Sequence, residues 1–217
     1  MVSRMLPLFP LHVVLFPGRP LPLHVFEPRY RRLLRDCLAA DRRFGVVAIR
    51  YGRAELGCAE VYRVGTVAEI VRVEQLDDGR SNIVTRGAER FRIKKLIPDA
   101  QPYLQAEVTL LQEETAAPSL APLTAELREY LQAYLINMGA GERLASRLPA
   151  NPSELAWLAA CAAELHISEQ QQLLEIDSLA TRLKTTTKLL RREQHLLRRF
   201  GQAAALRPAG PAGMMLN

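Results

Sequence analysis

The chain has 217 residues, of which 48% are hydrophobic and 24% charged, an ordinary composition for one large or two small globular domains. Its formal net charge is +6, and the excess lies in residues 1–112, which hold 18 Lys and Arg against 12 Asp and Glu. Three widely spaced cysteines exclude a disulfide scaffold and a zinc site of the CxxC kind, and they favour a reducing, cytoplasmic location.

The first predicted element is an extended, proline-rich segment over residues 6–26. Its prolines exclude the helix of a secretory signal, and no window of the chain has the roughly 20 apolar residues of a transmembrane helix. A solvated P-x-x-P ligand would be poor in large aliphatic residues, whereas this segment is crowded with them. We therefore expect short buried strands joined by turns, with prolines that limit pairing along a sheet edge. These prolines are Pro7, Pro10, Pro17, Pro20 and Pro22.

The remainder of the first half predicts one helix and several strands. Apolar residues from Tyr30 to Leu38 recur at helical spacing, and Pro28 suits a first helical turn, so residues 27–39 are predicted to be a helix. Alternating and β-branched residues then predict strands over 44–49, 60–75, 81–96 and 103–111. Gly65 is predicted to form a bulge in the second of these strands, and residues 77–79 to form a hairpin turn.

After Glu113 the alternating pattern of strands ends, and the sequence instead contains residues typical of helix N-termini. Helices are predicted over residues 122–137, 141–147, 152–163, 168–176 and 178–200, with N-terminal caps at Asn151 and Ser168. Leucines in the last helix repeat every seven residues, but the companion row is only half apolar, so a small helical bundle is favoured over a coiled coil. We expect three parts: a β-rich domain over residues 1–114, a helical domain over 115–200, and a disordered tail over 201–217.

Motifs for catalysis or cofactor binding are absent from the sequence. There is no glycine-rich phosphate loop, no serine in a nucleophile motif, and no histidine spacing that suits a metal. The four histidines are isolated from one another. The residues therefore give no case for an enzyme, and we expect no catalytic residue, no cofactor and no metal.

Two clusters of basic residues remain as candidate contact surfaces. One lies on the first predicted helix and the other on the last. A solvated helix face is the simpler interpretation of both, and docking of nucleic acid or an acidic peptide is the alternative. The clusters comprise Arg29, Arg31, Arg32 and Arg35, and Lys184, Lys188, Arg191, Arg192, Arg198 and Arg199.

Four stretches carry a family resemblance. LPLFPLHVVLFPGRPLPLHVFEPRY (residues 6–30), DRRFGVVAIR (41–50), VGTVAEIVRVEQLDDGRSNIVTRGAERFRI (64–93) and PYLQAEV (102–108) resemble, in the same order, the N-terminal substrate-binding domain of ATP-dependent Lon proteases. They look closer still to free-standing bacterial proteins made of that domain alone. The resemblance covers about residues 6–200. It implies an α+β fold: a PUA-like, β-rich pseudo-barrel with one helix, followed by a helical bundle that ends in a long helix.

The resemblance also implies what the chain does. In full-length Lon this region precedes an ATPase module and a protease module with a serine-lysine dyad, and the present sequence contains neither. The leading hypothesis is a non-catalytic, cytoplasmic module that binds unfolded or degradation-prone protein segments, acting with a protease or chaperone and free to assemble with copies of itself. RNA binding by the basic barrel is the alternative. No membrane partner is expected.

Six residues are candidates for peptide binding. Phe26, Glu27, Arg29 and Tyr30 lie where the opening segment meets the first helix, and a groove between barrel and helix is expected there. Arg86 and Gly87, in the loop-like break TRGAE, would form another side of that groove. In the alternative that we favour, Phe26 and Tyr30 pack in the core while Glu27 and Arg29 form a structural ion pair.

Overall fold

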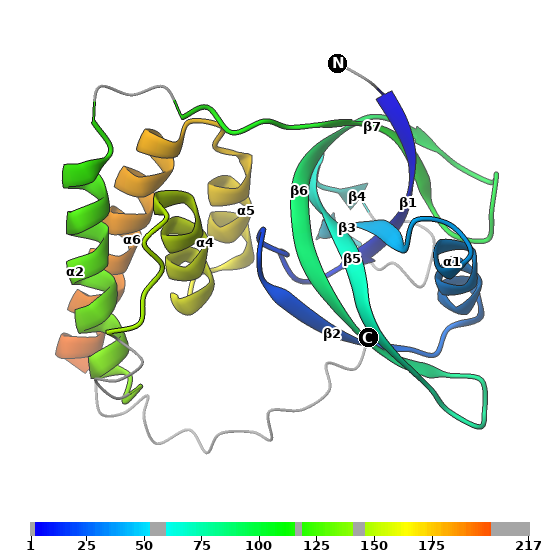
Figure 1. Cartoon of the computed structure of the whole chain (residues 1–217), viewed down its shortest axis with the longest axis horizontal. Helices are drawn as coiled ribbons and strands as arrows, with labels where there is room; N and C mark the ends of the chain where they lie inside the picture. The colour runs from blue at the N-terminus through cyan, green and yellow to red at the C-terminus, as the bar shows by residue number, and fades with distance from the viewer. Residues whose placement is uncertain (1–2, 53–59, 116–118, 141–145, 201–217) are drawn as a thin grey trace. The chain divides into compact units, whose positions relative to one another are not determined.

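A computed structural model describes residues 3–52, 60–115, 119–140 and 146–200. The chain divides between Gln112 and Glu113 into two compact units, a β-rich one and a helical one (Figure 1). Most of the predicted helix over 141–147 and the whole of the predicted tail over 201–217 lie outside the described residues.

The β-rich unit is a closed barrel. Its sheet follows the order β1-β7-β6-β5-β3-β4, and an additional pairing of β1 with β3 joins the two sides, while β2 pairs with β6 outside this path. All pairings are antiparallel except that of β1 with β3. The predicted pseudo-barrel is thus confirmed. The strands are β1 (Ser3–Leu11), β2 (Pro20–Val25), β3 (Arg43–Tyr51), β4 (Glu60–Val61), β5 (Val64–Gln75), β6 (Ser81–Ile97) and β7 (Gln105–Leu110).

Strand β1 changes partner midway, and this change closes the barrel. Residues 3–7 pair with β7, whereas residues 8–11 pair with β3. Among the residues that the structure describes, each half of β1 is therefore paired on one side only, which is where a strand tolerates proline. Because the amide of Leu8 donates to the carbonyl of Leu104, the nitrogens of Pro7 and Pro10 point to sides that lack a partner strand.

The predicted bulge at Gly65 is wrong in position. Gly65 pairs regularly with Phe91, and the register between β5 and β6 shifts instead between Thr66 and Ala68 and again between Ile70 and Arg72. Gly65 is required for close approach, since a Cβ there would lie within 3.0 Å of the Val46 carbonyl oxygen. The predicted strand over 60–75 is also divided, because β4 ends at Val61 before β5 begins.

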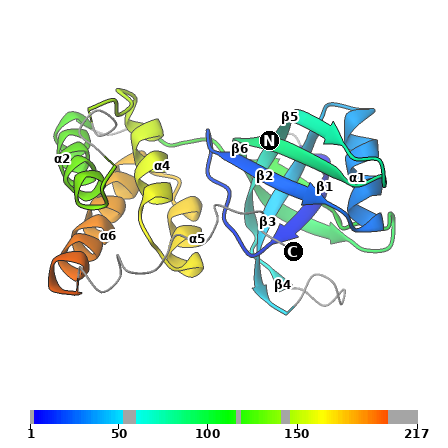
Figure 2. The same ribbon diagram turned by 90° about the horizontal axis from the view of Figure 1, so that it is seen from below.

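Helix α1 (Pro28–Leu38) packs its apolar side onto the barrel strands, at one end of the barrel in Figures 1 and 2. Tyr30, Leu33, Leu34 and Cys37 are buried there, as their helical spacing predicts. The cluster that they join contains Phe9 from β1, whose ring stacks on Tyr30 with 3.9 Å between ring centroids. A second apolar cluster is built mainly from β1, β5, β6 and β7.

The helical unit contains α2 (Ala121–Asn137), α4 (Pro152–Ala162), α5 (Ile167–Glu175) and α6 (Leu179–Phe200) in the described part of the chain. Leu183 and Leu190 of α6 are fully buried, so the seven-residue repeat forms an inner face of a bundle. Asn151 caps α4 as predicted, accepting from the amides of Ser153 and Glu154. The cap of α5 is His166 rather than the predicted Ser168.

A buried arginine ties the start of this unit to α6. The Arg182 side chain has no exposed surface, and its guanidinium lies 3.8 Å from the centroid of the Trp157 ring. It forms an ion pair with Glu113, which also accepts a hydrogen bond from Ser153 at 2.8 Å, and it donates to the Ile176 carbonyl at 3.0 Å. Removing one partner of such a buried pair is strongly destabilising. No helix that the structure describes is long and apolar enough to cross a membrane.

Candidate functional site

The predicted residues at the start of α1 are mostly structural. Tyr30 is 4% exposed and lies in the core, and Glu27 forms an ion pair with Arg29 at 2.7 Å. The Arg29 guanidinium also lies over the Tyr30 ring, 4.6 Å from its centroid. Phe26, Glu27 and Arg29 are half-buried, and Phe26 stacks against His24 with 5.9 Å between ring centroids.

Arg86 and Gly87 do not form a loop, contrary to the prediction. Both lie within the continuous strand β6, where Arg86 pairs with Pro20 of β2 and Glu69 of β5. Arg86 is opposite Pro20, the first residue of β2, whereas Phe26 directly follows Val25, the last one. At about 3.4 Å per residue, Arg86 and the Phe26 end of the strand are therefore roughly 17 Å apart. The structure thus does not bring the two predicted sides together into one groove.

Phe26 and Arg86 instead lie near opposite ends of a surface that we call the outer face, on the side of β2, β6 and β5 that points away from the barrel core. Pro22, Val84 and Arg72 are paired across the three strands in its middle row, and the side chain of Val71, at the register shift, is 62% exposed. Pro22, Val71 and Val84 form the apolar middle of this surface, and Arg72 and the other charged and polar residues border it. The outer face comprises Pro20, Pro22, His24, Val71, Arg72, Glu74, Asn82, Val84 and Arg86.

The free edge of β2 is blocked for strand addition. The Gly87 amide donates to the Arg19 carbonyl, so by alternation Leu21, Leu23 and Val25 direct their backbone groups toward β6. The backbone of Pro20 and Pro22 then faces the free edge, where neither residue has an N–H to donate. His24 is the one residue of β2 on this edge with an N–H, so a partner meets this sheet mainly through side chains on the outer face.

The arginines of α1 fall into two classes. Arg29 is paired with Glu27, and Arg32 donates to both oxygens of Asp36 at 2.9 Å. Arg31 and Arg35 form no ion pair with any residue in the described part of the chain. These two guanidinium groups lie one turn apart on the same helix.

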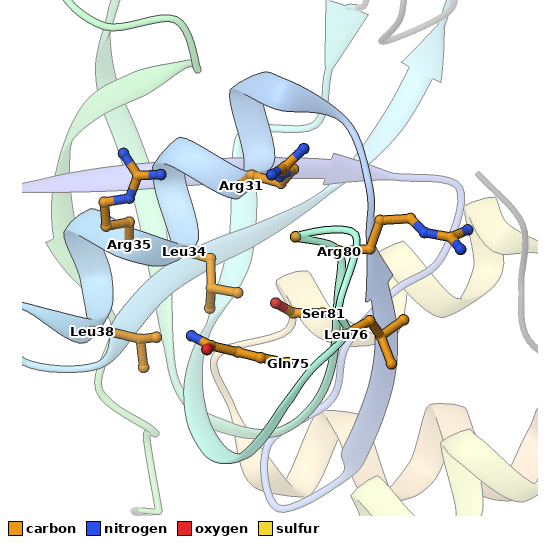
Figure 3. Close-up of a pocket in the computed structure, with 9 residues that line it drawn as sticks. Arg31, Leu34, Arg35, Leu38, Gln75, Leu76, Arg80 and Ser81 are labelled. Atoms are coloured by element: carbon orange, nitrogen blue, oxygen red, sulfur yellow. The ribbon is translucent and has the colours of Figure 1, made fainter.

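Arg31 and Arg35 line a pocket of about 280 Å³ between α1 and the hairpin that joins β5 to β6. Figure 3 shows Leu34 projecting from α1 toward Ser81 and Gln75, while Arg80 on the hairpin is directed away from the helix. Gly79 turns the hairpin with a φ of +80°, and a Cβ there would collide with the Arg31 guanidinium. The pocket is lined by Arg31, Leu34, Arg35, Leu38, Gln75, Leu76, Gly79, Arg80 and Ser81.

Two acidic residues close to this pocket, Asp36 and Asp78, are engaged with other partners, whereas Asp77 is exposed on the hairpin. Asp78 accepts from Arg80 at 2.6 Å. Asp36 accepts from Arg32 and, at 2.9 Å, from the Tyr103 hydroxyl. Partial burial raises the pKa of Asp36, but the hydrogen bonds from Arg32 and Tyr103 outweigh it, so that the pKa is lowered overall. Neither carboxylate forms an ion pair with Arg31 or Arg35, although the nearby charge of Arg35 also helps to lower the pKa of Asp36.

The second basic cluster is a solvated, internally paired helix face. Arg191 forms an ion pair with Glu126, and Arg192 forms ion pairs with Glu169 and Glu193. Lys184 and Lys188 are exposed on the same helix. The side chains of residues 198–200 lie outside the described part. This cluster thus carries less uncompensated charge than its sequence indicates.

The residues that the structure describes contain no group of three or more His, Cys, Asp or Glu side chains that could hold a metal ion. The sequence alone could not predict which residues form the outer face or the pocket. Its one usable signal was the alternation of Asn82, Val84 and Arg86 along β6, which marks an exposed side of a strand.

Comparison with known sequences gives one consistent picture. Residues 5–192 match the family model of the ATP-dependent protease La (LON) substrate-binding domain. The chain is 31% identical over 205 residues to Lon protease 2 of Myxococcus xanthus and 30% identical over 208 residues to Lon protease of Anaeromyxobacter dehalogenans. Each alignment covers 91% of this chain but 24% of the relative, so the chain spans about a quarter of these proteins.

Solved structures agree with the sequence comparison. The N-terminal domain of a Mycobacterium avium complex Lon protease matches with a TM-score of 0.71 and 23% identity, covering 87% of this chain and 98% of that one. A Lon N-terminal domain protein from Xanthomonas campestris matches with a TM-score of 0.64 and 28% identity, covering 83% of this chain and 95% of that one.

Proposed function

The chain belongs to the family of Lon substrate-binding domains, and from this premise we propose that it is a non-catalytic module that binds unfolded or degradation-prone protein segments on its outer face. The bound segment would then be passed, in the cytoplasm, to a protease or chaperone. The relatives match this chain over their substrate-binding region, so the proposal concerns recognition and not cleavage.

The observation that carries the proposal is the apolar middle of the outer face. Val71 is 62% exposed, Pro22 is exposed and Val84 is half-buried. Pro22 and Val84 are cross-strand partners, and Val71 directly precedes Arg72, the partner of Val84 on β5. Unfolded segments differ from folded proteins in presenting apolar side chains to solvent. An exposed apolar surface with a polar border is suited to such ligands.

The blocked edge of β2 indicates how binding would occur. Backbone pairing would fix a segment along the sheet and hold it with a ladder of hydrogen bonds. Since Pro20 and Pro22 remove donors from that edge, the apolar contacts on the outer face must provide the affinity. Contacts of this kind tolerate many sequences and release readily, which suits a module that transfers its ligand.

A titration with a chemically unfolded protein tests the proposal. A permanently unfolded, carboxymethylated protein is expected to bind in the micromolar range, and a folded version of the same protein is not. The double variant Val71→Glu/Val84→Glu places charges in the apolar middle and is expected to weaken binding by about tenfold or more, because apolar ligands are not compatible with buried, unpaired charge.

The matched control is the double variant Met5→Glu/Tyr51→Glu. It alters the net charge equally and replaces two other exposed hydrophobic residues of the same unit, whose exposures are 51% and 63%. It is expected to bind as the parent protein does. Equal losses in both double variants would refute a specific role of the outer face, and failure of the parent protein to bind would refute the function itself.

A further inference from the structure

Two of the four arginines of α1 have no ion-pair partner in the described part of the chain. Arg31 and Arg35 are four residues apart on one helix, a spacing at which like charges repel. The other two arginines of the helix have carboxylate partners, at 2.7 Å for Arg29 and 2.9 Å for Arg32. The two arginines without such partners among the described residues are the two that line the pocket.

The pocket combines this positive charge with an apolar floor. Leu34 is 5% exposed, lies between the two arginines in sequence and projects toward the hairpin (Figure 3). Leu38 and Leu76 line the pocket beside it, and the lining contains no carboxylate. A matching ligand must carry a negative charge and an apolar group within a few ångströms of each other.

We propose that this pocket binds the C-terminal end of a protein segment, with the terminal carboxylate held by Arg31 and Arg35 and an apolar last side chain resting on Leu34 and Leu38. The inference rests on the proposed function, because it assigns a particular end to the protein segments that the module binds. A terminal carboxylate accepts charge-assisted hydrogen bonds from guanidinium groups in the manner of other carboxylates.

The chemistry and the size of the pocket favour a chain end over an internal segment. The last residue of a chain carries a carboxylate and a side chain on the same Cα, so both groups reach the pocket together. An internal leucine supplies only the apolar group, and an internal aspartate or glutamate supplies only the charge. A pocket of about 280 Å³ is near the lower limit for small-ligand sites, which suits one or two residues rather than a long segment.

The test is a fluorescence anisotropy titration with two labelled peptides of one apolar sequence ending in leucine. One peptide has a free C-terminal carboxylate and the other a C-terminal amide. The free acid is expected to bind about tenfold more tightly, the equivalent of one hydrogen bond to a charged group at the lower end of its range. The difference is expected to shrink as salt is added.

Two double variants locate the effect. Arg31→Gln/Arg35→Gln is expected to abolish the preference for the free acid while still binding the amide. Arg63→Gln/Lys95→Gln removes the same charge from two exposed positions elsewhere in the β-rich unit and is expected to keep the preference. Loss of the preference in both double variants would indicate a general effect of net charge and would overturn the assignment to this pocket.

The other outcomes separate the inference from the proposed function. Equal binding of acid and amide by the parent protein would overturn the inference and leave the proposed function standing. Failure to bind either peptide or the unfolded protein would overturn both. Displacement of the free acid by a single-stranded RNA, lost in Arg31→Gln/Arg35→Gln, would assign the pocket to phosphates instead and also overturn the inference.

Discussion

Replacement of Gly87 by alanine is expected to destabilise the β-rich unit far more than a change of one methyl group indicates. A Cβ on Gly87 would lie within 3.0 Å of the Phe16 carbonyl oxygen and 3.0 Å from the Phe16 carbonyl carbon, and both of these are backbone atoms that cannot rotate away. The turn after β1 and strand β6 must therefore separate.

The magnitude follows from what that separation disturbs. Gly18 donates to the Gly87 carbonyl at 2.7 Å, and the Gly87 amide donates to the Arg19 carbonyl at 2.9 Å. Weakening two backbone hydrogen bonds costs about 2 kcal/mol, and overpacking adds about 1–3 kcal/mol. The lower entropy of an unfolded chain with alanine offsets about 0.4–1 kcal/mol. The net loss in free energy of unfolding is about 2–4 kcal/mol.

Urea and thermal unfolding followed by far-ultraviolet circular dichroism measure this loss, which corresponds to a fall in Tm of about 10–20 °C for a unit of this size. Gly18→Ala is the matched control in the same turn. Gly18 has a φ of +76° but open space where a Cβ would stand, so only left-handed strain of about 1 kcal/mol is expected. A Gly87→Ala protein as stable as the parent, or no less stable than Gly18→Ala, would refute the argument from close approach.

Three further outcomes are expected. Arg182→Ala removes a fully buried guanidinium and should lower the stability of the helical unit by about 3 kcal/mol, read from urea unfolding by the fluorescence of Trp157, the single tryptophan of the chain. Burial raises the pKa of the Cys37 thiol to about 12, so at pH 8 a thiol reagent should modify exposed Cys161 and spare Cys37 in peptide mass spectrometry. The pKa of Asp36 is lowered in the folded state, so Asp36→Asn should reduce stability at pH 7, and this difference should vanish as the pH falls through the folded-state pKa.

Each of these outcomes has its own control. Arg191→Ala removes a half-exposed arginine from the same helix as Arg182 and should cost less than about 1 kcal/mol. Labelling in denaturant should make Cys37 reactive, which shows that burial protected it. Tyr103→Phe removes one of the hydrogen bonds to Asp36 and should raise the pKa of that carboxyl. A stability difference for Asp36→Asn that persists at low pH would contradict the ionic explanation.

The fold could be predicted from the sequence because the local patterns and the family resemblance agreed. The spacing of Tyr30, Leu33, Leu34 and Cys37 correctly placed one face of α1 in the core. Gly87 shows where such reasoning stops. The stretch TRGAE, with a glycine among polar and charged residues, has the sequence pattern of a loop. In the fold, however, Gly87 has no room for a side chain because the backbone of Phe16, 71 residues away in sequence, lies against it.

The candidate sites were harder to predict from the sequence, because they depend on which side chains form ion pairs and hydrogen bonds in the fold. Arg32 and Asp36 have the spacing of a helical ion pair, so their pairing follows from the sequence. That Arg31 and Arg35 lie beside the β5–β6 hairpin does not, since it requires the packing of residues about 40 positions apart. The outer face likewise depends on the pairing of β2 with β6, which no local pattern specifies.

The partner change of β1 has a consequence for how the protein is made. Residues 3–7 are synthesised well before residues 105–109, with which they pair, whereas residues 8–11 pair with residues 45–48. Pairings at such long sequence separation are slow to form, and they must wait for the partner strand to be synthesised. The first strand therefore completes its pairing only when β7 arrives, and a nascent chain that ends before Gln105 leaves the first half of β1 without its partner.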